Sequence, residues 1–293
     1  MHRKFFTNAL LIGVTSFWLT GCTDIVEPPQ RSEPSALPSI TQGKTGQWHP
    51  GKFVWHDLLT EDTEAARKFY GDVFGWRFET KSDYTQIYNQ KELIGGMMQV
   101  TTAKDQKAQA VWLPSLSVAN IDKSIRYVKF KKGEVLKGPL VMKKRGKGVL
   151  VSDPHGAQVV LLRAKSGDPK DITPQVGDWL WNELWTNKPK ESYTFYRNLA
   201  GYDAYEMRDK YRILKHKGKW RAGIREIEKE DIKARWVPTI RISNLEETIS
   251  KVNASGGEVL VSPNEELANG NVALIKDSIG AIVIIQYWEE GGA

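Results

Sequence analysis

The pattern of apolar and polar positions along the chain occurs twice. Residues 54–76, VWHDLLTEDTEAARKFYGDVFGW, align without a gap with residues 180–202, LWNELWTNKPKESYTFYRNLAGY. Further short motifs of the first half return 124 positions later. They are Trp112-Leu113-Pro114 with Trp236-Val237-Pro238, Gly133–Leu136 with Gly257–Leu260, and Asp153–Gly156 with Asp277–Gly280. The repeat therefore covers a whole half of the chain.

Each copy begins with a pattern that predicts a strand and then a helix. The apolar runs Phe53–Leu59 and Trp179–Trp185 have the length of buried strands. In the segment after the first run, Ala65, Phe69 and Val73 recur at i, i+4 and i+8, which is the apolar stripe of an amphipathic helix. The second copy has the same spacing, so two equivalent strand–helix units are expected.

Within each half the order of strand, helix and strands also occurs twice. A second strand is expected at Val111–Val118, followed by a helix and by three short strands near 134–141, 148–152 and 157–164. The same order runs through 236–242, 245–254 and 258–287. The sequence therefore predicts an α+β fold of four βαβββ modules, arranged in two domains at 49–166 and 176–290.

The first 48 residues have a different composition. A positive start, the apolar run Ala9–Trp18 and the motif Leu19–Cys22 are typical of an export signal whose core is too short to span a membrane. The motif resembles the lipobox of bacterial lipoproteins, which implies cleavage after residue 21 and acylation of Cys22. Residues 22–48 are expected to be a flexible tether. The resemblance implies a lipid-anchored protein of the cell envelope, on the periplasmic side of the outer membrane.

Charge and cysteine content narrow the choice of partners. The formal net charge is +7, with basic runs at Lys129–Lys132 and Lys143–Lys147. No nucleic-acid-binding motif accompanies them, so nucleic acid is not expected as a partner. The runs are interpreted either as solvated surface or as a region that attracts anionic lipid headgroups. Cys22 is the only cysteine, so no internal disulfide is expected, and a monomer is expected because both domains lie in one chain.

One set of motifs resembles a known superfamily. Paired βαβββ modules carry Thr60-Glu61-Asp62 before a helix, Phe69-Tyr70 on it, Gly75-Trp76 after it and the hairpin Asp153–Gly156. This set resembles the vicinal oxygen chelate superfamily, which includes glyoxalase I, bleomycin-resistance proteins and extradiol dioxygenases. The resemblance implies that two modules form one cup-shaped mixed sheet, that ligands bind inside the cup, and that enzymes of the group hold a divalent metal there.

The metal positions implied by the resemblance carry apolar side chains in both halves. Counting from the shared motifs places them at Trp55, Leu113, Val160, Trp181, Val237 and Ile284. None of these side chains can donate a lone pair to a divalent cation. The sequence therefore predicts no cofactor. A divalent metal remains the alternative, because a shift of one residue in the first strand would exchange Trp55 for His56.

Strand alternation predicts which side chains face the two cups. The expected ligand-binding residues are Trp55, Leu113, Ser115, Val160, Trp181, Trp185, Val237, Thr239, Arg241 and Ile284. Asp57 and Glu183 are the acids on these faces and are the candidate catalytic residues. Each acid could orient a ligand or act as a general base. Alternatively, each could form an ion pair with a neighbouring cation, and Arg241 is the candidate partner of Glu183.

Three functions are compatible with this pattern. The first is a lipid-anchored protein that binds an apolar or aromatic small molecule without a metal, because the cups combine aromatic walls with few polar groups. The second is a lyase, isomerase or dioxygenase that uses a metal or one of the two acids. The third is an envelope protein-interaction module whose cups are filled by side chains.

Overall fold

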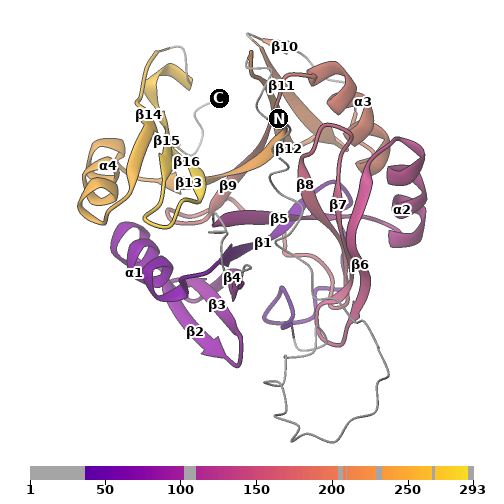
Figure 1. The fold of residues 1–293 in the computed structure, drawn as a ribbon, viewed down its shortest axis with the longest axis horizontal. Helices are drawn as coiled ribbons and strands as arrows, with labels where there is room; N and C mark the ends of the chain where they lie inside the picture. The colour runs from indigo at the N-terminus through magenta and orange to yellow at the C-terminus, as the bar shows by residue number, and fades with distance from the viewer. Residues whose placement is uncertain are drawn as a thin grey trace, which may run out of the picture.

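In the computed structural model, which describes residues 37–101, 110–203, 207–208, 210–228, 233–265 and 268–289, the chain forms two eight-stranded mixed sheets (Figure 1). The strand orders are β2-β3-β4-β1-β5-β8-β7-β6 and β10-β11-β12-β9-β13-β16-β15-β14. The two orders are equivalent, which confirms the α+β fold class and its cup-forming mixed sheets.

The first half contains β1 (Phe53–Thr60), α1 (Thr63–Phe74), β2 (Arg77–Lys81), β3 (Tyr84–Asn89), β4 (Glu92–Gln99), β5 (Val111–Ser117), α2 (Ile121–Phe130), β6 (Glu134–Met142), β7 (Gly146–Ser152) and β8 (Gln158–Ala164). The second contains β9 (Trp179–Thr186), α3 (Pro189–Ala200), β10 (Met207–Arg208), β11 (Tyr211–His216), β12 (Lys219–Glu226), β13 (Arg235–Ile242), α4 (Leu245–Ala254), β14 (Glu258–Val261), a 3₁₀ turn (Ala268–Gly270), β15 (Val272–Lys276) and β16 (Ile282–Tyr287).

The two modules of each half join through their first strands. β1 lies antiparallel to β5, with Trp55 opposite Ser115 and Leu58 opposite Trp112. β9 and β13 pair in the same way in the second half. Modules therefore pair within a half.

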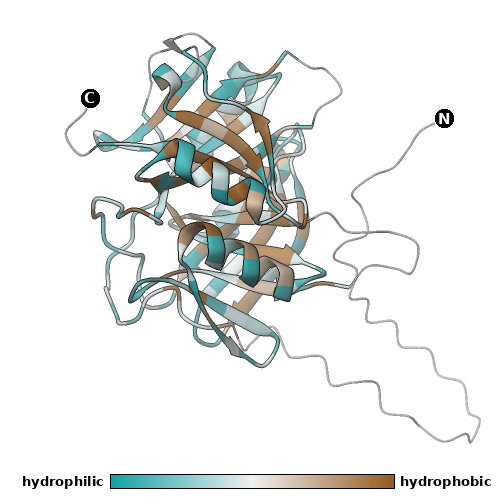
Figure 2. Cartoon of the chain, turned by 90° about the vertical axis from the view of Figure 1, so that its left-hand side faces the viewer, coloured by the Kyte–Doolittle hydropathy of each residue, from teal (hydrophilic) through white to brown (hydrophobic). Residues whose placement is uncertain are grey.

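The largest hydrophobic clusters lie between the two sheets. One combines side chains of β5, β7, β8 and α2 with side chains of β9, β11, β12 and α3, and the other combines α1 and its strands with α4 and its strands. Helices α1 and α4 lie side by side with the brown, apolar strands behind them (Figure 2). The helix-bearing faces of the sheets therefore face each other, and the opposite faces form the cups.

The repeated tyrosine motif connects the halves. Tyr70 of α1 donates a hydrogen bond to Asp277 of the second-half hairpin at 2.8 Å and accepts one from Trp112 at 2.6 Å. In the second copy, Trp236 donates to Tyr196 at 2.9 Å. Burial raises the pKa of Asp277 to about 6. Tyr70 of the first copy thus contributes a buried hydrogen bond to the contact between the halves.

His56 also lies between the halves, not in a cup. It is hydrogen-bonded through Nε2 to Oδ1 of Asn182, its counterpart in the repeat, at 2.9 Å. Its ring stacks on Trp179 with a centroid distance of 4.2 Å. Burial lowers the pKa of His56 to about 4. The strand register therefore keeps Trp55 on the cup face, and the alternative that placed His56 there is wrong.

The end of the expected tether is folded. Ile40 is 1% exposed, Trp48 donates a hydrogen bond to the carbonyl oxygen of Ala164 at 2.8 Å, and Arg145 donates to that of Pro38 at 3.1 Å. The prediction of a flexible segment up to residue 48 is thus wrong for residues 37–48, because Leu37 and Ile40 supply the apolar contacts that the composition alone seemed to lack. The expected signal peptide and Cys22 lie outside the described residues.

No helix in the described part of the chain is both long enough and apolar enough to cross a lipid bilayer.

Candidate functional site

The cup face of the first sheet carries side chains from β1, β5 and β8. Trp55 and Leu59 lie on this face of β1, and Leu113 lies opposite Asp57 on the neighbouring strand. Val160 packs against both apolar clusters of this cup. Ser115 lies between β1 and β8, opposite Trp55 and Val160, so the four residues expected in this cup share one surface.

A closed ion-pair network occupies this cup. Arg145 donates a hydrogen bond to Oδ2 of Asp57 at 2.7 Å, and Tyr84 and Trp55 donate to Oδ1 at 2.6 and 2.9 Å. Arg145 also donates to the Tyr84 hydroxyl at 2.6 Å. Burial raises the pKa of Tyr84 above its ordinary range. Both carboxylate oxygens of Asp57 are therefore used by the protein itself.

The first cup is filled by the chain. Ile40 belongs to the same buried cluster as Trp55, Met142 and Leu162, with Leu37 packed beside it. The carbonyl of Pro38 accepts its hydrogen bond from Arg145, which joins this segment to the ion-pair network. Residues 37–40 thus fill part of the first cup.

The second cup contains a related but more open network. Arg225 donates hydrogen bonds to both carboxylate oxygens of Glu183, from Nε at 2.9 Å and from Nη2 at 3.2 Å. Trp185 donates to the same carboxylate at 3.0 Å, and Trp181 donates to the Tyr211 hydroxyl at 2.6 Å. Burial, and then the charge of Glu183, raise the pKa of Tyr211. The side chain of Arg225 is 26% exposed, against 4% for Arg145 in the first cup.

An apolar surface lies beside this network. Val237 and Ile284 are buried there with Leu274, and Trp185 packs against them while it stays partly exposed. Thr239, on the strand between Trp181 and Ile284, is 1% exposed, and its hydroxyl has no hydrogen-bond partner among the described residues. The second cup thus combines half-buried indoles, an apolar surface and one unsatisfied hydroxyl.

Four residues of these networks were not predicted: Tyr84, Arg145, Tyr211 and Arg225. Arg225 could have been predicted from the pattern, because it lies two positions after Gly223 on the same strand and therefore on the same face of the sheet. Arg145 sits in the turn between β6 and β7, where no periodicity indicates a direction. The first cup receives its arginine from this turn and the second from strand β12, so the two positions are not equivalent and the repeat could not reveal them either.

The tyrosines explain the glycines that recur in both halves. A Cβ atom on Gly96 would lie 1.6 Å from the Tyr84 hydroxyl oxygen, and one on Gly223 would lie 2.0 Å from that of Tyr211. Only a residue without a side chain lets either ring lie across the strand.

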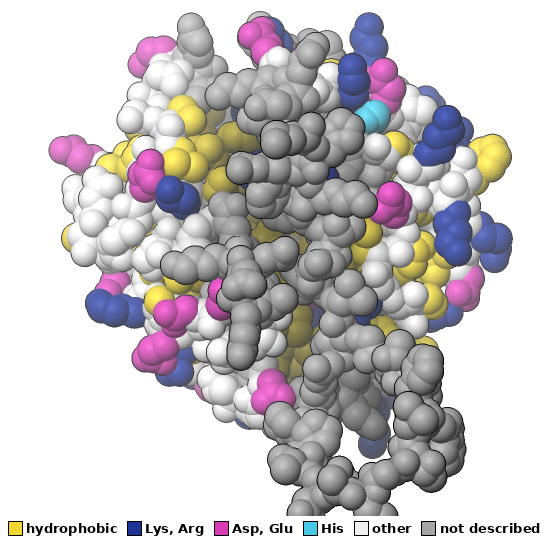
Figure 3. Space-filling view, in the orientation of Figure 1, with side chains coloured by type: hydrophobic (Ala, Val, Ile, Leu, Met, Phe, Trp, Pro, Cys, Tyr) yellow, Lys and Arg dark blue, Asp and Glu magenta, His cyan; other side chains and the backbone are white. Residues whose placement is uncertain are grey.

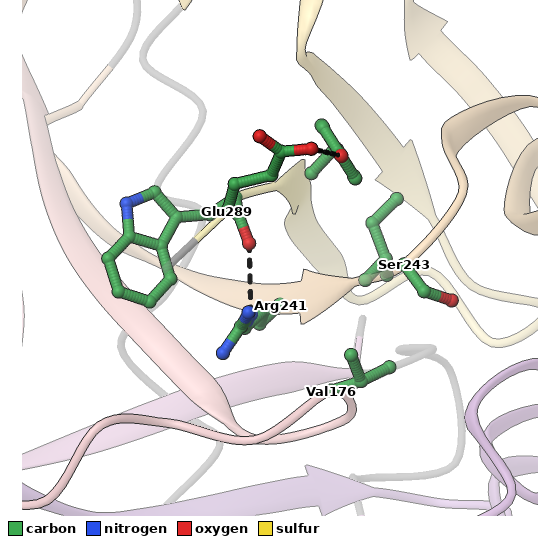
Figure 4. Close-up of a pocket in the computed structure, with 7 residues that line it drawn as sticks. Val176, Arg241, Ser243 and Glu289 are labelled. Atoms are coloured by element: carbon green, nitrogen blue, oxygen red, sulfur yellow. Dashed lines mark hydrogen bonds between the residues drawn. The ribbon is translucent and has the colours of Figure 1, made fainter. Parts of the chain in front are cut away.

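Arg241 does not pair with Glu183, so that expectation is wrong. Its guanidinium donates hydrogen bonds to the carbonyl oxygens of Pro174 and Trp288, at 2.5 and 3.1 Å, and lies over the Trp288 ring. Arg241 thereby lines a separate groove of about 360 Å³ at the ends of β13 and β16 (Figure 4). Its other lining residues are Val176, Ile242, Ser243, Tyr287, Trp288 and Glu289.

The donors of neither cup fit a divalent metal. The six positions where the resemblance places ligands carry indole or aliphatic side chains, and the nearby carboxylates of Asp57 and Glu183 are neutralised by arginines. Among the described residues there is no group of three or more His, Cys, Asp or Glu side chains that could hold a metal ion.

Paired βαβββ modules that form two cup-shaped sheets are the arrangement that the resemblance to the vicinal oxygen chelate superfamily implies. Residues 52–87 match the family model described as bleomycin resistance protein-like N-terminal. CFP32 of Mycobacterium tuberculosis (strain CDC 1551 / Oshkosh), provisionally named a glyoxylase, is 25% identical over 249 residues, which are 82% of this chain and 95% of the relative. The anthracycline biosynthesis protein DauV of Streptomyces sp. (strain C5) is 26% identical over 168 residues, 52% and 61% of the two chains.

Solved structures share the same architecture. The Mn(II)-bound glyoxalase from Novosphingobium aromaticivorans superposes with a TM-score of 0.55 at 14% identity, covering 82% of each chain. Homoprotocatechuate 2,3-dioxygenase from Brevibacterium fuscum, in complex with 3,4-dihydroxyphenylacetate, gives 0.57 at 13% identity and covers 84% of each chain. The chain is thus similar in sequence to a protein provisionally named a glyoxylase and, over residues 52–87, to bleomycin-resistance-like proteins, and it shares its fold with the two solved structures. The manganese of the first neighbour has no equivalent donor set among the described residues here.

Proposed function

We propose that this protein binds an aromatic small molecule in its second cup, without a metal. The observation that carries the proposal is the contrast between the cups. The first is filled by residues 37–40, whereas the second presents half-buried Trp181 and Trp185 beside an apolar surface. Mostly apolar concave surfaces with a few fixed polar groups are typical of small-molecule sites.

The polar groups of the second cup indicate the kind of ligand. Thr239 can donate a hydrogen bond to, or accept one from, an oxygen of the ligand, and a ligand that does so would satisfy a buried hydroxyl. Arg225 keeps Nε and Nη2 on Glu183, and the indoles offer faces for a planar ring. A ring that carries a hydroxyl or carbonyl group fits this set. The dihydroxyphenyl ligand of the structurally similar dioxygenase is of this class.

An enzyme is the second candidate, because Glu183 lies inside the cup proposed to bind the ligand. Both oxygens of its carboxylate already accept hydrogen bonds from Arg225, at 2.9 and 3.2 Å. Asp57 is a poorer candidate, since its hydrogen-bonding groups and the folded segment at residues 37–40 exclude a substrate. Catalysis by Glu183 would require the ligand to displace Arg225 from it.

We also propose that the protein is anchored in the cell envelope by acylation of Cys22. The support is the signal-like N-terminus and its lipobox motif. Labelled palmitate should enter the full-length chain in cells, and C22A should abolish the label. A labelled C22A protein would show that the acylation site is elsewhere.

Titration calorimetry with phenols, catechols and naphthoquinones tests the ligand proposal. Binding should weaken at least tenfold in W185A and in T239V, because each removes a contact of the second cup. W48A, which removes a half-buried indole from the first half, is the matched control and should bind as the parent does. Equal loss in W48A and W185A, or no binding by the parent, would contradict the proposal.

Metal content and product analysis separate the two candidates. Elemental mass spectrometry after exposure to zinc, nickel, iron and manganese should find no stoichiometric metal. The ligand should be recovered unchanged. A bound metal, or a product whose formation is lost in E183Q with binding retained, would establish the enzyme instead.

A further inference from the structure

The positive charge of this protein is concentrated in one segment. Residues 121–147 contain 10 of the 42 Lys and Arg residues but 2 of the 35 Asp and Glu residues. The rest of the chain thus holds 32 basic and 33 acidic residues and is close to neutral. The formal net charge of +7 therefore arises within these 27 residues.

This segment forms one side of the molecule, which we name the α2–β6 face. It consists of α2, the edge strand β6 and the turn that leads into β7, at the right of Figure 1. Basic side chains gather along that side in the space-filling view (Figure 3). Arg145 points away into the first cup, and Lys147 bonds Asp122. The exposed cations are Lys123, Arg126, Lys129, Lys131, Lys132, Lys143 and Lys144.

Large apolar side chains project from the same face. Phe130, at the end of α2, is 78% exposed, and Val141, near the end of β6, is 77% exposed. Among the described residues they are the most exposed large hydrophobic side chains. Leu136, which is also on β6, is a third exposed apolar side chain. Exposed apolar side chains together with lysines are the combination found on segments that bind at a membrane surface.

We infer that the α2–β6 face docks on an anionic lipid surface. Lysines near a membrane are attracted by acidic headgroups, and apolar side chains between them can enter the boundary between headgroups and acyl chains. A nucleic acid would match the lysines, but Val141 and Leu136 have no ring to stack on a base. The inference depends neither on the cup ligand nor on acylation of Cys22, since it concerns a different surface.

Cys22 is the only cysteine, which permits a site-specific test on the full-length chain. In a C22S background, an environment-sensitive fluorophore is attached to F130C, to V141C or, as control, to K188C, at the residue that precedes α3 in the other half. Vesicles of phosphatidylglycerol and phosphatidylcholine should shift the emission of the first two labels to the blue and leave the K188C label unchanged. Pure phosphatidylcholine vesicles should shift none of them.

Charge variants test the electrostatic part. K131E/K132E and K143E/K144E, each in the F130C and V141C label backgrounds, should weaken vesicle binding at least tenfold and make it less dependent on salt. K188E/K190E carries the same change in net charge on the other half and should leave binding unchanged. Equal weakening by all three pairs would show that only net charge matters and would overturn a specific face.

Other outcomes would overturn the inference as well. A blue shift at K188C equal to that at F130C would place the contact elsewhere, for example at the N-terminal segment. A shift produced by duplex DNA or heparin but not by the anionic vesicles would identify a polyanion as the partner. No shift at F130C and V141C on anionic vesicles would leave the face solvated.

Discussion

Asp57 and Glu183 occupy equivalent positions in the repeat, yet their surroundings differ. The side chains of Asp57 and Arg145 are 6% and 4% exposed and form a sealed pair, whereas Arg225, the partner of Glu183, remains accessible. A buried carboxylate requires its cation, because removal of one partner leaves an uncompensated charge. We therefore interpret the first pair as structural and the second as part of a binding surface.

Removal of Arg145 should be strongly destabilising. R145M is expected to lower the free energy of unfolding by about 3–5 kcal/mol, because the Asp57 carboxylate would stay buried without a counterion. R225M should cost less than half as much, since water reaches its partner site. Urea denaturation of both variants measures the difference, and the double variant D57N/R145M should recover part of the loss. Equal costs at the two sites would contradict the assignment.

His56 should make stability sensitive to acid. Its pKa is about 4 in the folded chain and 6.5 ordinarily. Between pH 4 and pH 6.5 the unfolded chain therefore binds more protons than the folded chain does. The free energy of unfolding should thus fall by about 3 kcal/mol from pH 7 to pH 4 through this residue.

The variant H56N isolates this effect. It keeps an amide opposite Asn182 but does not titrate, so the difference in stability between parent and variant should shrink toward low pH. Asp277 has the opposite effect on stability between pH 3.8 and about 6. Its raised pKa makes the folded state bind the proton more strongly than the unfolded state, so this residue stabilises the fold as the pH falls. A parent-minus-H56N difference that is the same at pH 7 and pH 4 would disprove the role of His56.

At the scale of elements, one glycine on strand β4 determines where the Tyr84 ring can lie on the sheet. Gly96 lies opposite Gln86 on β3 and Asp57 on β1, and the Tyr84 ring crosses directly above it. The ring can reach Asp57 only because this strand position has no side chain. The same relation between Gly223 and Tyr211 in β12 shows that both cups use it.

An alanine at position 96 should displace the Tyr84 ring and break its hydrogen bond to Asp57. G96A is expected to destabilise the chain by about 3 kcal/mol, near the upper end for overpacking. The double variant G96A/Y84A should cost less than the sum of the single variants, because the clash is then absent. Thermal and urea denaturation measure these values, and full additivity would refute the proposed contact.

At the scale of the whole molecule, the two halves share the largest hydrophobic clusters, while each keeps only smaller clusters in its own cup. Both large hydrophobic clusters take side chains from both halves, and Tyr70 and His56 each bond a residue of the other half. Separation would expose the helix-bearing face of each sheet to water.

The chain should accordingly unfold in one cooperative transition. Near-ultraviolet and far-ultraviolet circular dichroism should give coincident midpoints, and a fragment comprising residues 37–166 alone should fail to give a cooperative transition. Two resolved transitions, or a stable isolated half, would show that the halves are independent domains.

The sequence by itself determined the repeat, the order of strands and helices and the face on which Trp55, Leu113 and Val160 lie. These follow from local periodicity, which the chain imposes through backbone geometry. Asp62, which the motif Thr60-Glu61-Asp62 places before a helix, accepts a hydrogen bond from the amide of Ala65 and caps α1. The apolar character of the expected metal positions also needed only counting.

Only the tertiary structure decided what each cup contains. Arg145 enters the first cup from a turn, Ile40 enters it from a segment that looked like tether, and Arg225 replaces Arg241 as the partner of Glu183. Such contacts join residues far apart in sequence, and their energies depend on burial and geometry that periodicity does not encode. The repeat therefore determined two similar sheets, whereas long-range packing sealed the ion pair of one cup and left the arginine of the other partly exposed.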